Sequence, residues 1–154
     1  MVSFNNQLII KIKREIVFDF ISKLENIPLW NYYVIKVNPI SELGTKDNLY
    51  KQTRINDSQI IKIANKDFPN SIKIQTVGEN NFEFERTLKL MEDDEGNTIL
   101  DDTFFIYKGF PKLAMKLFKH KIKAAVHENL KKLKELLETG ETVLQNGKIS
   151  KFKQ

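Results

Sequence analysis

The chain has 154 residues, of which 41% are apolar and 29% are charged, the composition of a soluble globular protein with one core. It contains no Cys, which excludes disulfides and thiolate metal sites and suits a reducing compartment. We see no signal-peptide core and no apolar run of membrane-spanning length, so we expect a cytoplasmic, single-domain protein without stable membrane insertion.

The net charge of +5 is unevenly distributed along the chain. Residues 111–154 hold eleven Lys, no Arg and four Glu, whereas residues 1–110 hold 14 basic and 16 acidic residues. This basic surplus would allow weak contact with an anionic surface, but a solvated Lys-rich helix face explains it more simply. The lack of Arg argues against a nucleic-acid partner, because Arg makes the bidentate contacts to bases and phosphates.

The first third of the chain changes its apolar period twice. Residues 2–12 alternate apolar and polar side chains, which predicts an opening strand. Residues 15–24 then place their apolar side chains on one helical face, which predicts a short helix. Pro28 suits the first turn of a second short helix, which carries the only tryptophan, Trp30.

A run of short strands follows. Period-two patterns predict six of them, at residues 34–40, 48–55, 58–65, 71–77, 82–91 and 98–107. A loop at 41–47 separates the first two, and Asn56–Asp57 joins the next pair as a hairpin, because these residues tolerate tight turns. Every strand connection is short enough for antiparallel pairing.

The longest element is a predicted helix over residues 111–139, about 43 Å long. Its apolar residues recur every three or four positions: Met115, Phe118, Ile122, Val126, Leu130, Leu133 and Leu137. Pro111 suits the first position of this helix, and Gly140 suits the left-handed residue that ends it. The pattern predicts an α+β domain over residues 1–140, followed by a loosely held basic tail at 141–154.

Four local strings, in this β-α-α-β6-α order, carry a resemblance to a known family. They are residues 15–21 (EIVFDFI), 26–31 (NIPLWN), 96–98 (GNT) and 129–138 (NLKKLKELLE). Together they resemble the START-like, Bet v 1-type superfamily, particularly its polyketide cyclase/dehydrase-like bacterial branch, over residues 2–140. The resemblance implies a helix-grip fold, in which a curved antiparallel sheet of about seven strands wraps the C-terminal helix and leaves an apolar cavity.

Two charged residues stand among apolar neighbours in the predicted strands. Arg86 shares a strand side with Phe84, and Asp102 shares one with Phe104. The turn at residues 94–96 would let Arg86 and Asp102 approach diagonally on the cavity face. A buried charge is costly unless it is paired, so such a pair would orient a polar ligand head. The alternative is that a twist or bulge brings one or both side chains to solvent.

Aromatic and sulfur-containing residues complete the predicted ligand site. Trp30 and Tyr33 lie where the resemblance places a cavity wall, although ordinary packing of the short helix explains them equally well. Phe104, Met115 and Phe118 would face the cavity mouth. The predicted ligand-binding residues are therefore Trp30, Tyr33, Phe84, Arg86, Asp102, Phe104, Met115 and Phe118.

Catalytic signals are weak. His120 and His127 lie about 10 Å apart along one helix, too far to share a metal, and we interpret them as surface residues. We find no phosphate-binding glycine loop, and we predict no catalytic residues, metal or cofactor. The sequence favours a protein that binds a small hydrophobic molecule, such as a lipid, isoprenoid or aromatic metabolite. The alternative is a polyketide cyclase or aromatase that acts in the same cavity, and both monomer and homodimer remain open.

Overall fold

The computed structural model describes residues 1–40, 48–109 and 111–153, so the loop expected at 41–47 lies outside the described residues. The main sheet comprises β1 (Val2–Ile10), β2 (Val34–Ile40), β3 (Leu49–Arg54), β4 (Ser58–Asp67), β5 (Ser71–Thr76), β6 (Glu83–Glu92) and β7 (Thr98–Lys108). The helices are α1 (Arg14–Ile21), the 3-10 helix η1 (Leu24–Leu29) and α2 (Lys112–Thr139). A second, two-stranded sheet contains β8 (Glu141–Val143) and β9 (Ile149–Lys151).

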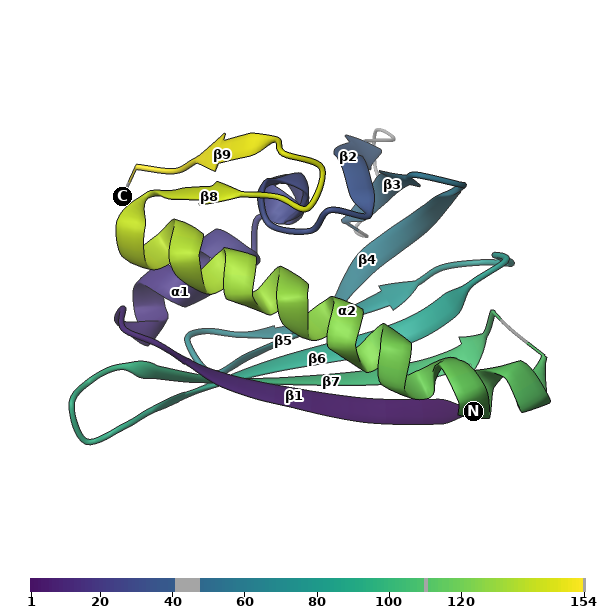
Figure 1. The fold of residues 1–154 in the computed structure, drawn as a ribbon, viewed down its shortest axis with the longest axis horizontal. Coiled ribbons are helices and arrows are strands. Elements are labelled where there is room, and N and C mark those ends of the chain that lie inside the picture. Colours follow the sequence, from purple (N-terminus) through teal and green to yellow (C-terminus); the bar gives the residue numbers. More distant parts are fainter. Residues whose placement is uncertain (41–47, 110, 154) are drawn as a thin grey trace.

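The seven strands form one antiparallel sheet in the order β1-β7-β6-β5-β4-β3-β2. Register shifts in β2, β4 and β6 mark irregular positions, and such bulges bend a strand and increase its twist. The sheet curves as a result, and α2 lies across its concave side (Figure 1). The predicted α+β helix-grip fold is confirmed.

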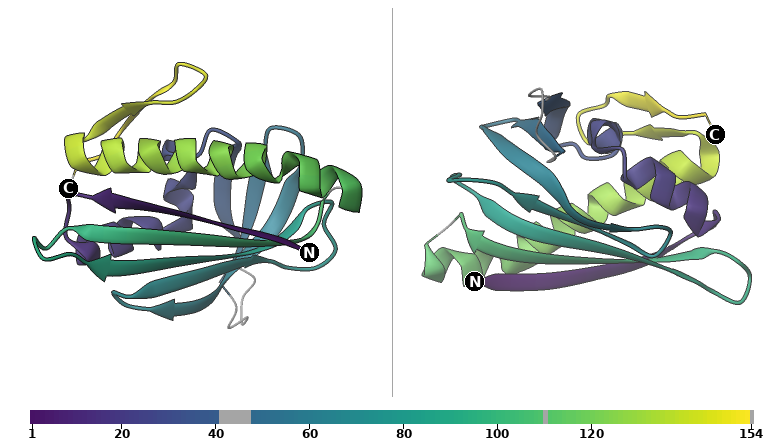
Figure 2. Two further views of the ribbon diagram at one scale, coloured as in Figure 1. Left: turned by 60° about the horizontal axis from the view of Figure 1, so that its bottom comes forward. Right: turned by 180° about the vertical axis from the view of Figure 1, so that it is seen from behind.

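The helices link the two edges of this sheet. Because β1 and β2 lie at opposite edges, α1 and η1 carry the chain from one edge to the other near the C-terminal end of α2 (Figure 2). Gly140 ends α2 with a φ of 85°, and its N–H donates to the carbonyl of Leu136 at 2.9 Å. The left-handed end predicted for this helix is therefore present.

The segment after α2 corrects the expectation of a loosely held tail. It folds back as the β8–β9 hairpin, in which Gly147 adopts a φ of 85° at the turn. Leu144 is buried, and the ring of Phe152 packs edge-on against Phe20 with centroids 4.5 Å apart. The Asn146–Gly147 pair is a strong hairpin signal, and the apolar residues around it supply the contacts that hold the segment.

Candidate functional site

A cavity of about 530 Å³ lies between the concave side of the sheet and the N-terminal half of α2. Apolar side chains from β4 to β7 and from α2 form most of its wall, among them Ile61, Ile74, Phe84, Phe104 and Ile122. Exposed lining residues mark its mouth, among them Tyr33 at 44%, Ile55 at 48% and Phe118 at 41%. The cavity is thus an apolar chamber that opens to solvent.

Arg86 is the charged residue on the inner wall of this chamber. Its Nε and Nη2 atoms donate to the two carboxylate oxygens of Asp102, at 2.8 and 2.7 Å. Arg86 is 6% exposed and Asp102 is fully buried. Ionic groups buried this deeply are tolerated only as a hydrogen-bonded pair, and the side-on bidentate geometry supplies that pairing.

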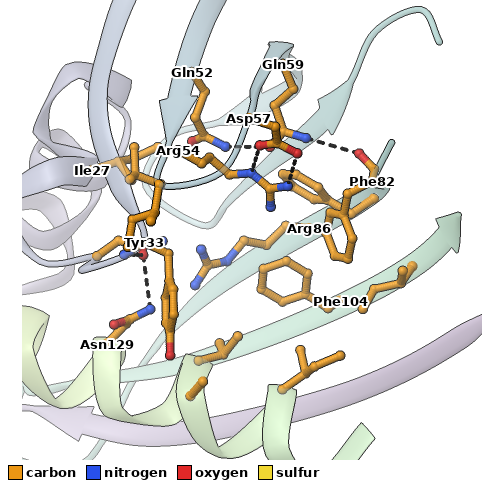
Figure 3. Close-up of a pocket in the computed structure, with 18 of the residues that line it drawn as sticks. Ile27, Tyr33, Gln52, Arg54, Asp57, Gln59, Phe82, Arg86, Phe104 and Asn129 are labelled. Atoms are coloured by element: carbon orange, nitrogen blue, oxygen red, sulfur yellow. Dashed lines mark hydrogen bonds and ion pairs between the residues drawn. The ribbon is translucent and has the colours of Figure 1, made fainter. Parts of the chain in front are cut away.

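Two aromatic rings hold the Arg86 guanidinium in place. Its Cζ atom lies 4.6 Å from the ring centroid of Phe104 and 5.2 Å from that of Trp30. Figure 3 shows this side chain reaching into the middle of the cavity. Its Nη1 atom hydrogen-bonds no other residue in the described part of the chain, so it remains available as a donor.

A pair of buried glutamines forms a second polar spot on the wall. Nε2 of Gln52 donates to Oε1 of Gln59 at 2.8 Å, and Nε2 of Gln59 donates to the carbonyl of Phe82 at 3.0 Å. Both glutamines line the cavity and are nearly inaccessible from outside. Their chain of hydrogen bonds fixes both amides, and Oε1 of Gln52 accepts from no described residue.

Arg54 and Asp57 form an ion pair at the rim. Nε and Nη2 of Arg54 donate to the Asp57 carboxylate, each at 2.6 Å, and the guanidinium lies 5.0 Å from the ring of Phe82. The hydrogen bonds from Arg54 hold the pKa of the Asp57 carboxyl below its ordinary value. This pair therefore stays ionised and engaged at neutral pH.

Amide side chains connect the cavity to the C-terminal hairpin. Nδ2 of Asn129 on α2 donates to Oδ1 of Asn31 at 3.1 Å, and Oδ1 of Asn129 accepts from Gln145 at 3.1 Å. Asn31 and Asn129 both line the cavity. This chain of hydrogen bonds ties α2 to the residues before β2 and to the hairpin turn, so it fixes that end of the chamber.

Comparisons with known proteins identify the fold. No protein-family model matches the chain, and no curated protein matches it either. A START superfamily protein from Mycobacterium smegmatis aligns with a TM-score of 0.69 at 12% identity, covering 88% of this chain and 98% of that protein. The fold is START-like.

Two further solved structures align with this chain at similar TM-scores and identities. A protein from Thermus thermophilus aligns with a TM-score of 0.66 at 15% identity, covering 87% of this chain and 95% of that one. XoxI from Bacillus cereus aligns with a TM-score of 0.69 at 13% identity, covering 88% of this chain and 94% of that one. Likeness at such identities concerns the fold alone, so any function must be argued from this chain's own residues.

The START-like fold brings five of the eight predicted site residues into the cavity wall. They are Tyr33, Phe84, Arg86, Phe104 and Phe118. Asp102 and Trp30 do not line the cavity but contact the Arg86 guanidinium. Met115 is buried in the core outside the lining. Its position departs from the expected cavity mouth, because the first turn of α2 lies beyond the chamber.

Sequence reasoning missed the polar residues contributed by β3, β4 and α2. Gln52 and Gln59, like Arg54 and Asp57, lie close to the turn at Asn56–Asp57. The predicted hairpin, with its two-residue turn at Asn56–Asp57, would have paired Gln52 with Ile61, whereas the observed register pairs Gln52 with Gln59. The predicted register therefore did not indicate the glutamine pair, and nothing in the sequence indicates that Asn129 would meet Asn31.

Neither histidine joins the site. His120 is exposed and His127 is half-buried on α2. The described residues contain no group of three or more His, Asp or Glu side chains arranged to hold a metal ion. No helix in the described ranges is long and apolar enough to cross a membrane.

Proposed function

We propose that this chain binds a small, largely apolar molecule in the cavity, with a lipid, an isoprenoid or an aromatic metabolite as the ligand class. The observation that carries the proposal is an apolar chamber of about 530 Å³ with one buried, oriented guanidinium on its wall. Small-molecule sites typically enclose about 300–1,000 Å³ and combine apolar walls with a few polar groups. Affinity would come from burial of apolar surface, at about 25 cal/mol per Å².

The polar groups of the wall would bind the polar end of the ligand. Nη1 of Arg86 supplies a charged donor and Oε1 of Gln52 an acceptor, so a hydroxyl, carbonyl or carboxylate group would be held there. Asp102 neutralises the charge of Arg86 and fixes its geometry, while the ring of Trp30 packs near the guanidinium. Asp102 and Trp30 would thus position Arg86, whereas Phe84 and Phe104 would contact the apolar body of the ligand.

Displacement of anilinonaphthalene sulfonate by oleate, farnesol or 2-naphthol tests the proposal. Arg86→Ala alone would leave Asp102 buried without a partner, which destabilises proteins by about 3–5 kcal/mol. The double variant Arg86→Met/Asp102→Leu replaces the pair with apolar residues of similar size, so it should stay folded. We expect this variant to bind the three probes about tenfold or more weakly, because a hydrogen bond to a charged group is lost.

A matched control is available on the other face of the same sheet. Lys73 and Glu85 form an ion pair at 3.3 Å on β5 and β6, and they alternate with the cavity-facing residues. Lys73→Met/Glu85→Leu should leave probe affinity unchanged. The proposal is wrong if two results are found together. None of the three probes displaces anilinonaphthalene sulfonate from the wild-type protein, and native mass spectra of protein purified from its host show no bound ligand.

The cyclase or aromatase alternative needs an acid or base in the chamber. Among the described lining residues, Asp57 is the only carboxylate, and Arg54 already occupies both of its oxygens. This favours binding without turnover. Prolonged incubation with a poly-β-keto thioester mimic would separate the two functions, because a cyclase would release a product lighter by one water.

A further inference from the structure

We propose that the N-terminal half of α2 docks onto an anionic lipid bilayer. The docking face consists of Leu113 and Leu117, flanked by Lys116, Lys121 and Lys123. Leu113 and Leu117 are not among the residues that line the cavity, whereas Lys121 borders it, and the inference does not depend on a ligand in the chamber. The proposal of ligand binding and the proposal of membrane docking can therefore be disproved independently of each other.

The apolar part of the docking face is unusually exposed. Leu113 is 78% exposed and Leu117 is 71% exposed, and residues four apart lie one above the other on a helix. Single exposed apolar residues are ordinary, so the neighbourhood matters. Met1 at 78% and Tyr107 at 53% lie at the same end of the molecule, because β1 begins beside the end of β7 (Figure 1).

The charge of the docking face has one sign. Residues 111–127 hold five Lys, two His and no Asp or Glu. By helical geometry Lys116 and Lys123 lie on one side of the leucine strip and Lys121 lies on the other. None of these three lysines forms an ion pair with a described residue. The first turn of α2 has no acidic residue, so the positive end of the helix dipole adds to the field.

This combination fits a bilayer better than the other anionic or apolar partners. An apolar strip with lysine on both sides is the pattern of a helix that lies in the membrane interface, where lysine stems reach up to the headgroups. A nucleic acid would offer the two leucines no apolar environment. A second copy of this chain would bring two surfaces of like charge together, which is unfavourable.

Co-sedimentation with vesicles tests the docking. We expect the protein to bind phosphatidylcholine vesicles containing about 30% phosphatidylglycerol at low salt, and to release them at high salt because charges are then screened. It should not bind vesicles of phosphatidylcholine alone. Lys116→Gln/Lys123→Gln should weaken binding about thirtyfold, since each lysine near an anionic surface contributes about fivefold.

The leucines have a matched control in the C-terminal hairpin. Leu113→Gln/Leu117→Gln should weaken vesicle binding about tenfold by removing the inserted side chains. Val143 and Ile149 are paired on β8 and β9, which follow the C-terminal end of α2, and they are 45% and 55% exposed. Val143→Gln/Ile149→Gln should change nothing, and Lys148→Gln/Lys151→Gln controls for net charge.

A single label reports which face meets the bilayer. Because the chain has no Cys, Leu117→Cys and Ile149→Cys can each be labelled uniquely with a polarity-sensitive fluorophore. The label at position 117 should shift to the blue on anionic vesicles and the label at 149 should not. The proposal is overturned if anionic vesicles bind no better than neutral ones, or if the leucine substitutions leave binding unchanged. Duplex DNA binding that depends on the lysines but not on the leucines would also overturn it.

Discussion

The two halves of α2 share one apolar period but have different surroundings. In the C-terminal half, Leu130, Leu133 and Leu136 are completely buried. Ile122 in the N-terminal half and Val126 at the middle of the helix are half-buried and line the cavity. The same stripe therefore forms a solid core at one end and the roof of a chamber at the other.

The difference comes from what lies opposite each half. At the C-terminal end, α1, η1 and the β8–β9 hairpin lie around the helix (Figure 2), and buried residues of α1 and η1 share one core with those of α2. The N-terminal half spans the open, curved part of the sheet, where side chains from β4 to β7 do not reach it everywhere. A continuous apolar stripe thus indicates which side of a helix faces the sheet, but not whether the intervening space is filled.

The largest expected effect is on the free energy of unfolding when Leu and Ile, which have equal numbers of atoms, are truncated at two positions of this stripe. Leu133→Ala should lower the free energy of unfolding by about 3 kcal/mol, because it opens a void in a closed core. Ile122→Ala removes the same number of atoms from a wall that already borders open space, and it should cost about 1 kcal/mol. Urea unfolding followed by circular dichroism measures both. Equal losses would show that the N-terminal half is packed as tightly as the C-terminal half.

A smaller effect should follow from narrowing the chamber. A Cβ atom added at Gly109 would lie 2.5 Å from Cδ2 of Phe82, a lining residue, so the ring must move. Gly109→Ala should cost about 1–2 kcal/mol of stability, in the range of other overpacked sites, and should weaken displacement of anilinonaphthalene sulfonate by oleate. Adding Phe82→Leu to Gly109→Ala should restore both properties. Failure of this rescue would mean that Gly109 matters for its backbone rather than for space.

The smallest expected effect is on stability, from loss of the Arg54–Asp57 ion pair at the rim of the cavity. Because Arg54 lowers the pKa of Asp57 in the folded state, the pair adds stability above the ordinary carboxyl pKa of 3.8 and loses it as the pH falls through the lowered value. Asp57→Asn should therefore cost less than about 1 kcal/mol at neutral pH, as partly exposed ion pairs do. The difference from wild type should vanish at strongly acidic pH. A difference that grows on acidification would contradict this assignment.

Much of the fold could be predicted because it depends on local patterns. Period-two alternation predicted the seven strands of the main sheet within a few residues, and Gly140 ended α2 where expected. The diagonal approach of Arg86 and Asp102 was also predicted, because strand alternation and a short turn set their faces and their register. The hairpin at residues 141–151 was missed, although Asn146–Gly147 signalled it.

The sequence by itself determined which side chains face inward, where the chain turns, and that a charged pair would stand among apolar residues. Only the tertiary structure decided that Trp30 supports Arg86 instead of lining the cavity, that Met115 lies beyond the chamber, and that Gln52, Gln59 and Asn129 border it. The physical reason is that alternation and helical period assign a face to each residue, whereas a cavity depends on how far a sheet curves away from its helix. That distance arises from bulges and long-range packing, which no local pattern encodes.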